Sequence, residues 1–130
     1  MEHYPKAIDP DMVGEYPASV KLGAGYFYDD VLEYRVWCYP ELGSPDEAKG
    51  ADYFRAFASY EEALAFSRAT RGAGLPLVLV RQWEWIHEPS KGVYIHERGE
   101  RLVEWQVRWL SGSRRGEDSI PAFFAARQLA

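Results

Sequence analysis

The stretch from Pro76 to Leu110 constrains the fold of this chain more than any other part of the sequence. In its last third, hydrophobic and polar residues alternate one by one, which is the period of a β-strand with one buried face. Its first part, Leu77 to Ile86, is a nearly continuous apolar run of the kind found in buried strands. Between them lies Val93 to Arg98, followed by Gly99, which we expect beside a tight turn. The stretch therefore predicts three consecutive strands, of which the last two form a hairpin.

Two strands and one helix are predicted before this stretch. Val31 to Tyr39 alternates between an apolar and a mixed face, and it ends at Pro40 because proline cannot donate to a sheet ladder. Tyr53 to Ala58 is a second, shorter strand. The segment Ser59-Tyr60-Glu61-Glu62 is a capping box, in which the serine hydroxyl accepts a hydrogen bond from the amide three residues later. It predicts a helix from Tyr60 to Arg71.

These elements predict a single α+β domain over residues 1–130. We expect a two-layer sandwich, with a mostly antiparallel five-stranded sheet packed on one main helix, in the order β-β-α-β-β-β. Pro121 opens a short C-terminal helix that runs to Gln128. Residues 1–30 are interrupted by prolines and glycines, and we expect them to form an irregular N-terminal arm.

The formal net charge of −5 is unevenly distributed along the chain. Residues 1–62 carry five Lys/Arg against thirteen Asp/Glu, whereas residues 63–130 carry ten against seven. The acidic total argues against a general nucleic-acid binder, which needs a basic face. The asymmetry either steers a partner or a second copy of the chain, or leaves two solvated halves.

The apolar and cysteine content indicates a cytoplasmic protein. No run of about 18 apolar residues is present, so the sequence predicts no membrane-spanning helix. The N-terminus has no basic-then-apolar signal pattern. Cys38 is the one cysteine, which excludes an internal disulfide framework and zinc sites built from several cysteines.

Tryptophan is the most informative residue type in the sequence. Five tryptophans in 130 residues is a dense set, and four of them lie between Pro76 and Leu110. Their rings form either a core packed on the helix or an exposed surface that stacks on a flat ligand, a sugar or a partner's side chains. The candidate binding surface consists of Trp83, Trp85, Trp105, Trp109 and Trp37.

Two histidines form a candidate acid–base or metal site. His87 ends one predicted strand and His96 lies in the next, so neighbouring strands would bring both near one edge, with Glu84 or Glu104 as a third group. The H-E-x-x-H spacing is absent, and the alternative is two solvated histidines. We therefore assign no catalytic residue and no metal ligand, and we expect Cys38 to be a small core hydrophobe and not a nucleophile.

One part of the sequence resembles a known family. The string FASYEEALAFS from Phe57 to Ser67, followed by PLVLVRQ from Pro76 to Gln82, resembles small bacterial proteins labelled GCN5-related acetyltransferases. The resemblance covers Val31 to Leu110 and implies an acyl-CoA-dependent N-acetyltransferase of reduced size. That superfamily binds the CoA pyrophosphate with a Q/R-x-x-G-x-G/A turn. Here Ala69 stands where Gln or Arg belongs, so we assign no CoA ligand and expect no cofactor.

The leading hypothesis is a small cytoplasmic binding or protein-interaction module without catalysis of its own. It would act through the aromatic sheet surface, as a homodimer or with a protein partner. The alternatives are the acetyltransferase-like enzyme and a metal-dependent hydrolase that uses His87 and His96. A concave pocket where polar groups converge would favour an enzyme, whereas a flat apolar patch or an open strand edge would favour an interaction module.

Overall fold

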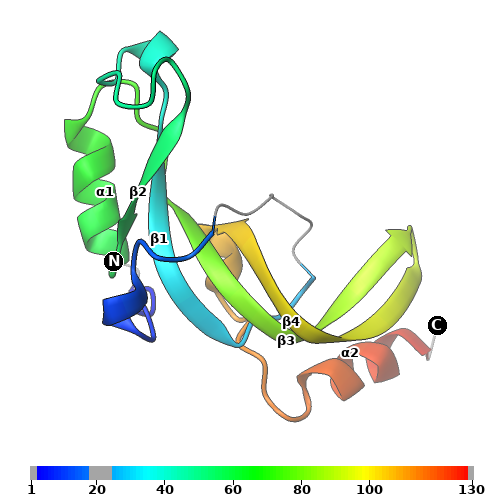
Figure 1. The fold of residues 1–130 in the computed structure, drawn as a ribbon. Helices are drawn as coiled ribbons and strands as arrows, with labels where there is room; N and C mark the ends of the chain where they lie inside the picture. Colours follow the sequence, from blue (N-terminus) through cyan, green and yellow to red (C-terminus); the bar gives the residue numbers. More distant parts are fainter. Residues whose placement is uncertain (1–2, 18–24, 129–130) are drawn as a thin grey trace.

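The computed structural model describes residues 3–17 and 25–128. Its strands form one four-stranded sheet in the order β2-β1-β3-β4, and each neighbouring pair is antiparallel. The sheet is curled, and β3 and β4 extend beyond it as a long hairpin (Figure 1). The strands are β1 (Asp30–Cys38), β2 (Tyr53–Phe57), β3 (Leu77–Ser90) and β4 (Val93–Gln106).

Two α-helices lie at opposite ends of the sheet. The first, α1 (Tyr60–Ala69), lies beside β1 and β2, and the second, α2 (Ser119–Gln128), lies along the hairpin (Figure 1). Because β1 separates β2 from β3 and is antiparallel to both, the β2–α1–β3 connection is a crossover between parallel strands. Three short 3-10 turns complete the described elements: η1 (Pro10–Met12), η2 (Pro40–Leu42) and η3 (Val107–Leu110).

The start of α1 is the one predicted by the capping box. Ser59 has an extended backbone, and its hydroxyl accepts a hydrogen bond from the Glu62 amide at 3.2 Å. The same hydroxyl donates a hydrogen bond to Glu62 Oε1 at 2.9 Å, so the Glu62 carboxylate holds the side chain of Ser59 in its capping position. The predicted N-cap is thus confirmed, and it places Tyr60 in the first turn of α1.

Two clusters of buried side chains hold the elements together. The larger one fills the space between α1, η3 and one face of the sheet, where Tyr34, Val78 and Trp105 pair across three strands. The smaller one joins the hairpin to α2 through Ile86 and Phe123, with Tyr26 and Phe27 packed beside them. The hairpin is therefore anchored by its own helix, away from the main core.

The predicted architecture, a five-stranded sheet packed on one main helix, is wrong. The chain does not reverse at Gly99 but at Lys91 and Gly92, so the two segments expected as separate strands after Ser90 are one continuous strand, β4. Gly99 has a backbone φ of +130° and lies where the register between β3 and β4 shifts. A glycine in this conformation produces a β-bulge, which bends the strand without ending it.

The described part of the predicted N-terminal arm packs on the domain. The Ala7 amide donates to the Ala58 carbonyl and the Ile8 amide to the Val31 carbonyl, each at 2.8 Å. Residues 1–2 and 18–24 of the predicted arm lie outside the described residues. Over the described ranges, no helix is both long and apolar enough to cross a membrane.

Candidate functional site

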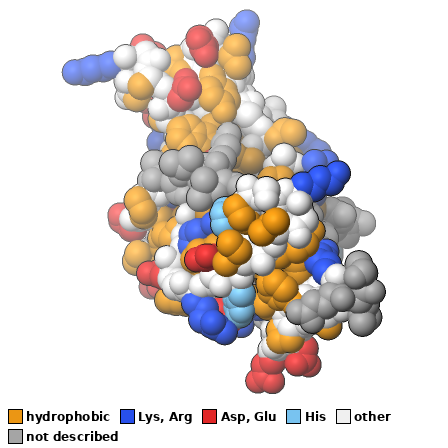
Figure 2. Space-filling view, turned by 90° about the vertical axis from the view of Figure 1, so that its right-hand side faces the viewer, with side chains coloured by type: hydrophobic (Ala, Val, Ile, Leu, Met, Phe, Trp, Pro, Cys, Tyr) orange, Lys and Arg blue, Asp and Glu red, His pale blue; other side chains and the backbone are white. Residues whose placement is uncertain are grey.

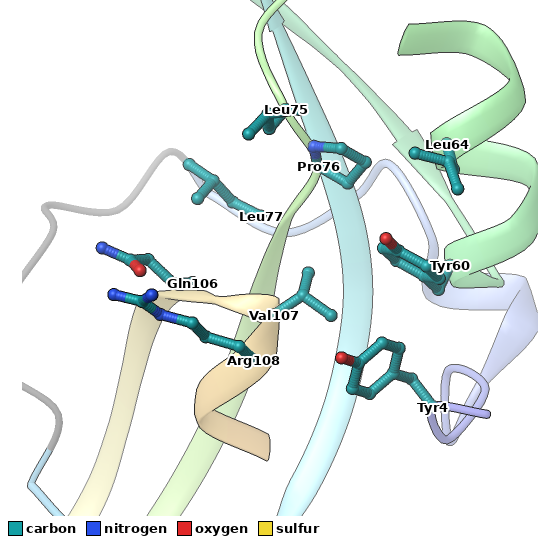
Figure 3. Close-up of a pocket in the computed structure, with 9 residues that line it drawn as sticks. All are labelled: Tyr4, Tyr60, Leu64, Leu75, Pro76, Leu77, Gln106, Val107 and Arg108. Carbon is teal, nitrogen blue, oxygen red and sulfur yellow. The ribbon is translucent and has the colours of Figure 1, made fainter. Parts of the chain in front are cut away.

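A groove of about 360 Å³ lies where α1, the start of β3 and the η3 turn meet (Figure 3). This volume falls in the range of roughly 300 to 1,000 Å³ that small-molecule sites usually have. Most of the lining is apolar, as is typical of such sites. The lining residues are Tyr4, Tyr60, Leu64, Leu75, Pro76, Leu77, Gln106, Val107 and Arg108.

One wall of the groove is aromatic. Tyr60 stands in the first turn of α1, and its ring meets the Tyr4 ring edge-on, with centroids 4.9 Å apart and planes at 75°. Tyr4 is held in place because the neighbouring Pro5 carbonyl accepts a hydrogen bond from the buried Tyr34 hydroxyl. Leu64 follows Tyr60 by one helical turn and extends the same wall (Figure 3).

The floor of the groove is built by the two chain segments that enter and leave the hairpin. Pro76 directly precedes β3 and Val107 directly follows β4, and Leu77 pairs with Gln106 between them. Leu75 forms the rim and is 80% exposed. These residues meet because β3 and β4 are paired along their full length.

The polar side of the groove carries a positive charge. Gln106 and Arg108 lie together next to Leu77, on the side away from the tyrosines (Figure 3). Within residues 3–17 and 25–128, the Arg108 guanidinium makes no ion pair or hydrogen bond, and neither does the Tyr60 hydroxyl. None of the lining residues that the structure describes is acidic. The groove therefore offers a ligand apolar walls and hydrogen-bond donors that have no partner among the described residues.

The structure places the predicted tryptophan surface partly in the core. Trp105 is 1% exposed, and the half-buried Trp109 packs against it edge-on with ring centroids 6.0 Å apart. Trp37 donates its indole hydrogen to the carboxylate of Glu104 at about 3.0 Å. Trp105 is therefore a core residue, whereas Trp37 and Trp109 are half-buried and contact side chains inside the domain.

The hairpin carries the remaining two tryptophans. Trp83 is 44% exposed beneath the Arg81 guanidinium, and Trp85 is half-buried beneath that of Arg101, 4.4 Å from its ring centroid. Figure 2 looks onto the side of the molecule from which the hairpin projects, and hydrophobic side chains gather there. The exposed large apolar side chains of the hairpin are Trp83, Val93 and Ile95.

The structure brings His96 and Glu84 together but leaves His87 apart. His96 Nε2 lies 2.8 Å from Glu84 Oε1. His96 pairs with Ile86, and His87 pairs with Ile95. Because neighbouring residues of a strand point to opposite faces, the two histidines lie on opposite faces of the hairpin.

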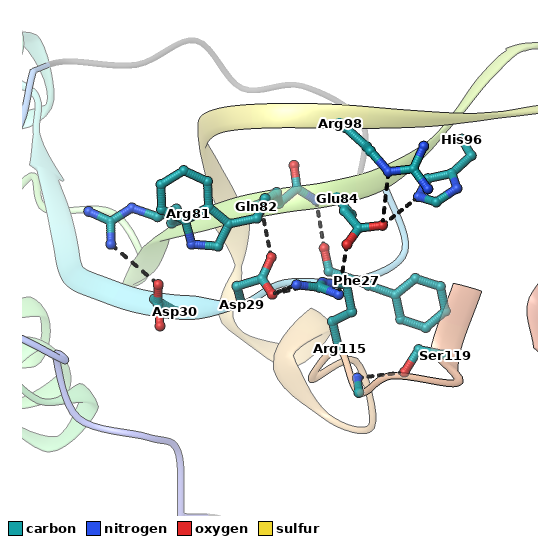
Figure 4. A network of polar contacts seen from close by, with 12 residues as sticks. Phe27, Asp29, Asp30, Arg81, Gln82, Glu84, His96, Arg98, Arg115 and Ser119 are labelled. Carbon is teal, nitrogen blue, oxygen red and sulfur yellow. Dashed lines mark hydrogen bonds and ion pairs between the residues drawn. The ribbon is translucent and has the colours of Figure 1, made fainter. Parts of the chain in front are cut away.

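Glu84 is the centre of a polar network that ties the hairpin to the start of β1 (Figure 4). Arg115 binds Glu84 Oε2 at 3.1 Å and Asp29 Oδ1 at 2.7 Å. The hydrogen bond to Asp29 raises the pKa of Arg115 and keeps it charged. Arg98 lies 3.6 Å from the same glutamate. Because His96, Arg98 and Arg115 all contact its carboxylate, Glu84 links the hairpin to neighbouring segments and is not a free base.

A buried ion cluster lies on the sheet face opposite the main core, and the sequence did not indicate it. Arg35 binds Glu33 Oε2 at 2.6 Å and Glu104 Oε2 at 3.3 Å, and none of the three side chains is more than 1% exposed. Arg35 also donates to the Pro17 carbonyl at 2.7 Å. The Gly14 amide donates to Glu33. The cluster thereby fastens the N-terminal arm to the sheet.

Cys38 is buried, as expected of a core residue. Burial raises the pKa of its thiol, which disfavours the reactive thiolate. Among the residues that the structure describes, no group of three or more His, Cys, Asp or Glu side chains is arranged to hold a metal ion.

Comparison with known proteins gives one partial similarity. No family model matches the chain. Homoserine kinase from Zymomonas mobilis subsp. mobilis is 30% identical to this chain over 73 residues, which is 52% of this chain and 23% of that protein. The chain thus matches less than a quarter of the length of this curated relative. No solved structure matches the chain.

Proposed function

We propose that this chain is a binding module that holds a small, mainly apolar ligand in the groove between α1, β3 and η3. The observation that supports this most is the groove itself, which has apolar walls. It also holds two hydrogen-bond donors, the Tyr60 hydroxyl and the Arg108 guanidinium, that have no partner among the described residues. A buried ligand would cover the lining side chains and satisfy these donors. The proposal agrees with the binding module expected from the sequence, but it places the binding site in the groove and not on the tryptophan surface.

The chemistry of the lining favours binding over catalysis. Apart from the tyrosine hydroxyls, the lining residues within 3–17 and 25–128 offer no general base and no nucleophile. A hydrolase built on His87 and His96 gains no support from two histidines on opposite hairpin faces. An acetyltransferase would need a CoA pyrophosphate turn, which the sequence lacks. A match over 23% of homoserine kinase does not carry that protein's activity to this chain.

A homodimer remains part of the proposal, with different contact residues. Trp105 is occupied in the core, so the apolar surface available to a second copy is that of the hairpin, at Trp83, Val93 and Ile95. Apolar patches of this kind mark association sites when they are contiguous.

Binding can be tested with 1-octanol, an uncharged probe with an apolar chain. We expect saturable binding by isothermal titration calorimetry to the wild-type chain. Leu64→Trp should weaken it about tenfold or more, because the larger ring fills the groove. Leu42→Trp is the matched control, since Leu42 is 64% exposed and lies outside the groove.

Two results would contradict the proposal. One is the absence of saturable octanol binding to a folded wild-type chain. The other is equal binding by Leu64→Trp and Leu42→Trp. If Leu64→Trp fails to fold by circular dichroism, Leu75→Trp replaces it, because this rim residue is 80% exposed and its change should leave the core intact.

A further inference from the structure

We infer that the ligand of the groove is an anion with an apolar tail, of the alkyl carboxylate class. This inference rests on the proposed function and adds the charge and shape of the ligand to it. It follows from the electrostatics of the lining and from the positions of its polar groups.

The charge of the lining is one-sided. Among the described residues, Arg108 is the charged residue of the lining, and no aspartate or glutamate lines the groove to neutralise it. Other arginines of the chain are already paired: Arg35 with Glu33, and Arg115 with Asp29. Arg108 differs from these, because its guanidinium has no partner within the described residues. A ligand with a negative group would complement the groove, whereas a cation would be repelled.

The sequence around Arg108 explains why its side chain stays outside the core. Val107 and Leu110 are the buried residues of η3, and they point into the main cluster. Gln106 and Arg108, on either side of Val107, are exposed. The turn therefore buries its apolar side chains and presents an amide and a guanidinium next to each other, as Figure 3 shows.

The positions of the polar groups define the shape of the ligand. Gln106 and Arg108 lie at one end of the groove and the wall of Tyr60 and Leu64 lies at the other, with Pro76 and Val107 between them (Figure 3). A guanidinium binds a carboxylate through two parallel hydrogen bonds, and an amide NH₂ adds a third donor. A carboxylate at Arg108 thus leaves an unbranched tail to run over Pro76 towards Tyr60.

The inference is tested with three probes of equal tail length: octanoate, 1-octanol and octylammonium. Octanoate should bind the wild-type chain about three- to fivefold more tightly than octanol, the effect expected of a solvent-exposed ion pair. Octylammonium should bind most weakly. Arg108→Gln should remove the preference, so that octanoate and octanol bind with equal affinity. Arg114→Gln, an exposed arginine outside the groove, is the control and should change neither affinity.

A second variant guards against misfolding of the first. Gln106→Leu removes the amide at the same end of the groove and should reduce the preference for octanoate over octanol. Equal binding of octanoate and octanol to the wild-type chain, or a preference that survives Arg108→Gln, would overturn the anionic class while octanol binding still supports the groove. A chain that binds none of the three probes would instead overturn the proposed function. A short peptide of leucine and aspartate that binds through Arg108 when octanoate does not would overturn the small-molecule class in favour of a protein segment.

Discussion

Arg35 and Glu104 are 69 residues apart in the chain, yet Nη1 of the arginine lies 3.3 Å from Oε2 of the glutamate at a site closed to water. Leu79 of β3 stands between their strands and pairs with Glu33 on one side and Glu104 on the other. One guanidinium therefore holds together a carboxylate of β1 and a carboxylate of β4 across the strand between them, β3. Removing the guanidinium would leave both carboxylates buried without a counter-charge.

We therefore expect Arg35→Met to destabilise the fold by about 3 kcal/mol or more, the cost of breaking a buried pair from one side. The free energy of unfolding is measured by urea denaturation. Arg55→Met is the matched control, because Arg55 pairs with Glu47 at the surface, where both side chains are more than 40% exposed. It should cost less than about 1 kcal/mol. Equal losses in the two variants would show that burial of the cluster contributes nothing.

The N-cap of α1 gives a second prediction. Ser59→Ala removes the acceptor of the Glu62 amide, and we expect a loss of about 1 kcal/mol in the free energy of unfolding. Ser90→Ala, at the exposed end of β3, is the control and should have no measurable effect. The wall of the groove begins at Tyr60, so Ser59→Ala should also weaken octanol binding. An unchanged melting curve would mean that the cap does not hold this helix.

The elements that the sequence predicted well are those with a local cause. The capping box at Ser59 needs four consecutive residues, and it located the start of α1. The turn predicted beside Gly99 was wrong because a glycine between two polar residues fits a turn and a β-bulge equally well. Pairing of β3 with β4 on both sides of Gly99 decides between them, and that is a contact between distant residues.

The parts that the sequence did not predict depend on long-range contacts. The alternation of Glu33, Arg35 and Trp37 indicated a mixed strand face, but its burial depends on Glu104 in another strand. The groove likewise combines residues from the N-terminal arm, α1, β3 and η3, and each segment looks like ordinary core or loop by itself. No local signal distinguished Arg108 from the other exposed arginines of the chain.

The hydrogen bond between Tyr26 and Glu88 predicts a pH dependence of stability. The Tyr26 hydroxyl donates to Glu88, which raises the pKa of Tyr26 to about 12. Since this pKa exceeds the ordinary value of about 10, and the same bond lowers the pKa of Glu88, the bond stabilises the folded chain fully between about pH 5 and pH 10. That contribution is lost as the pH rises through about 12.

The stability difference between wild type and Tyr26→Phe should therefore be constant between about pH 5 and 10 and shrink between about pH 10 and 12. Thermal unfolding of both chains over this range measures it. Glu88→Ala should give the same profile, because it removes the partner of the same bond. A difference that stays constant up to pH 12 would contradict the assignment.

Association of the chain gives a fourth prediction. We expect a homodimer at high micromolar concentration by light scattering, and we expect Ile95→Glu to shift it to a monomer while the chain stays folded. Trp109→Glu, in contrast, should destabilise the fold, because this ring packs on buried Trp105. A monomeric wild-type mass would rule out the dimer, and a dimer that survives Ile95→Glu would rule out the hairpin as its contact.

Nuclear magnetic resonance of the methyl groups during an octanoate titration tests ligand binding in the groove most directly. We predict saturable shifts of the Leu64, Leu75 and Val107 methyl signals, with the signals of Leu42 and Ile95 unchanged, because the first three residues line the groove and the last two do not. Shifts that grow linearly without saturation, or that appear at Ile95 and not at Leu64, would contradict a binding site in this groove.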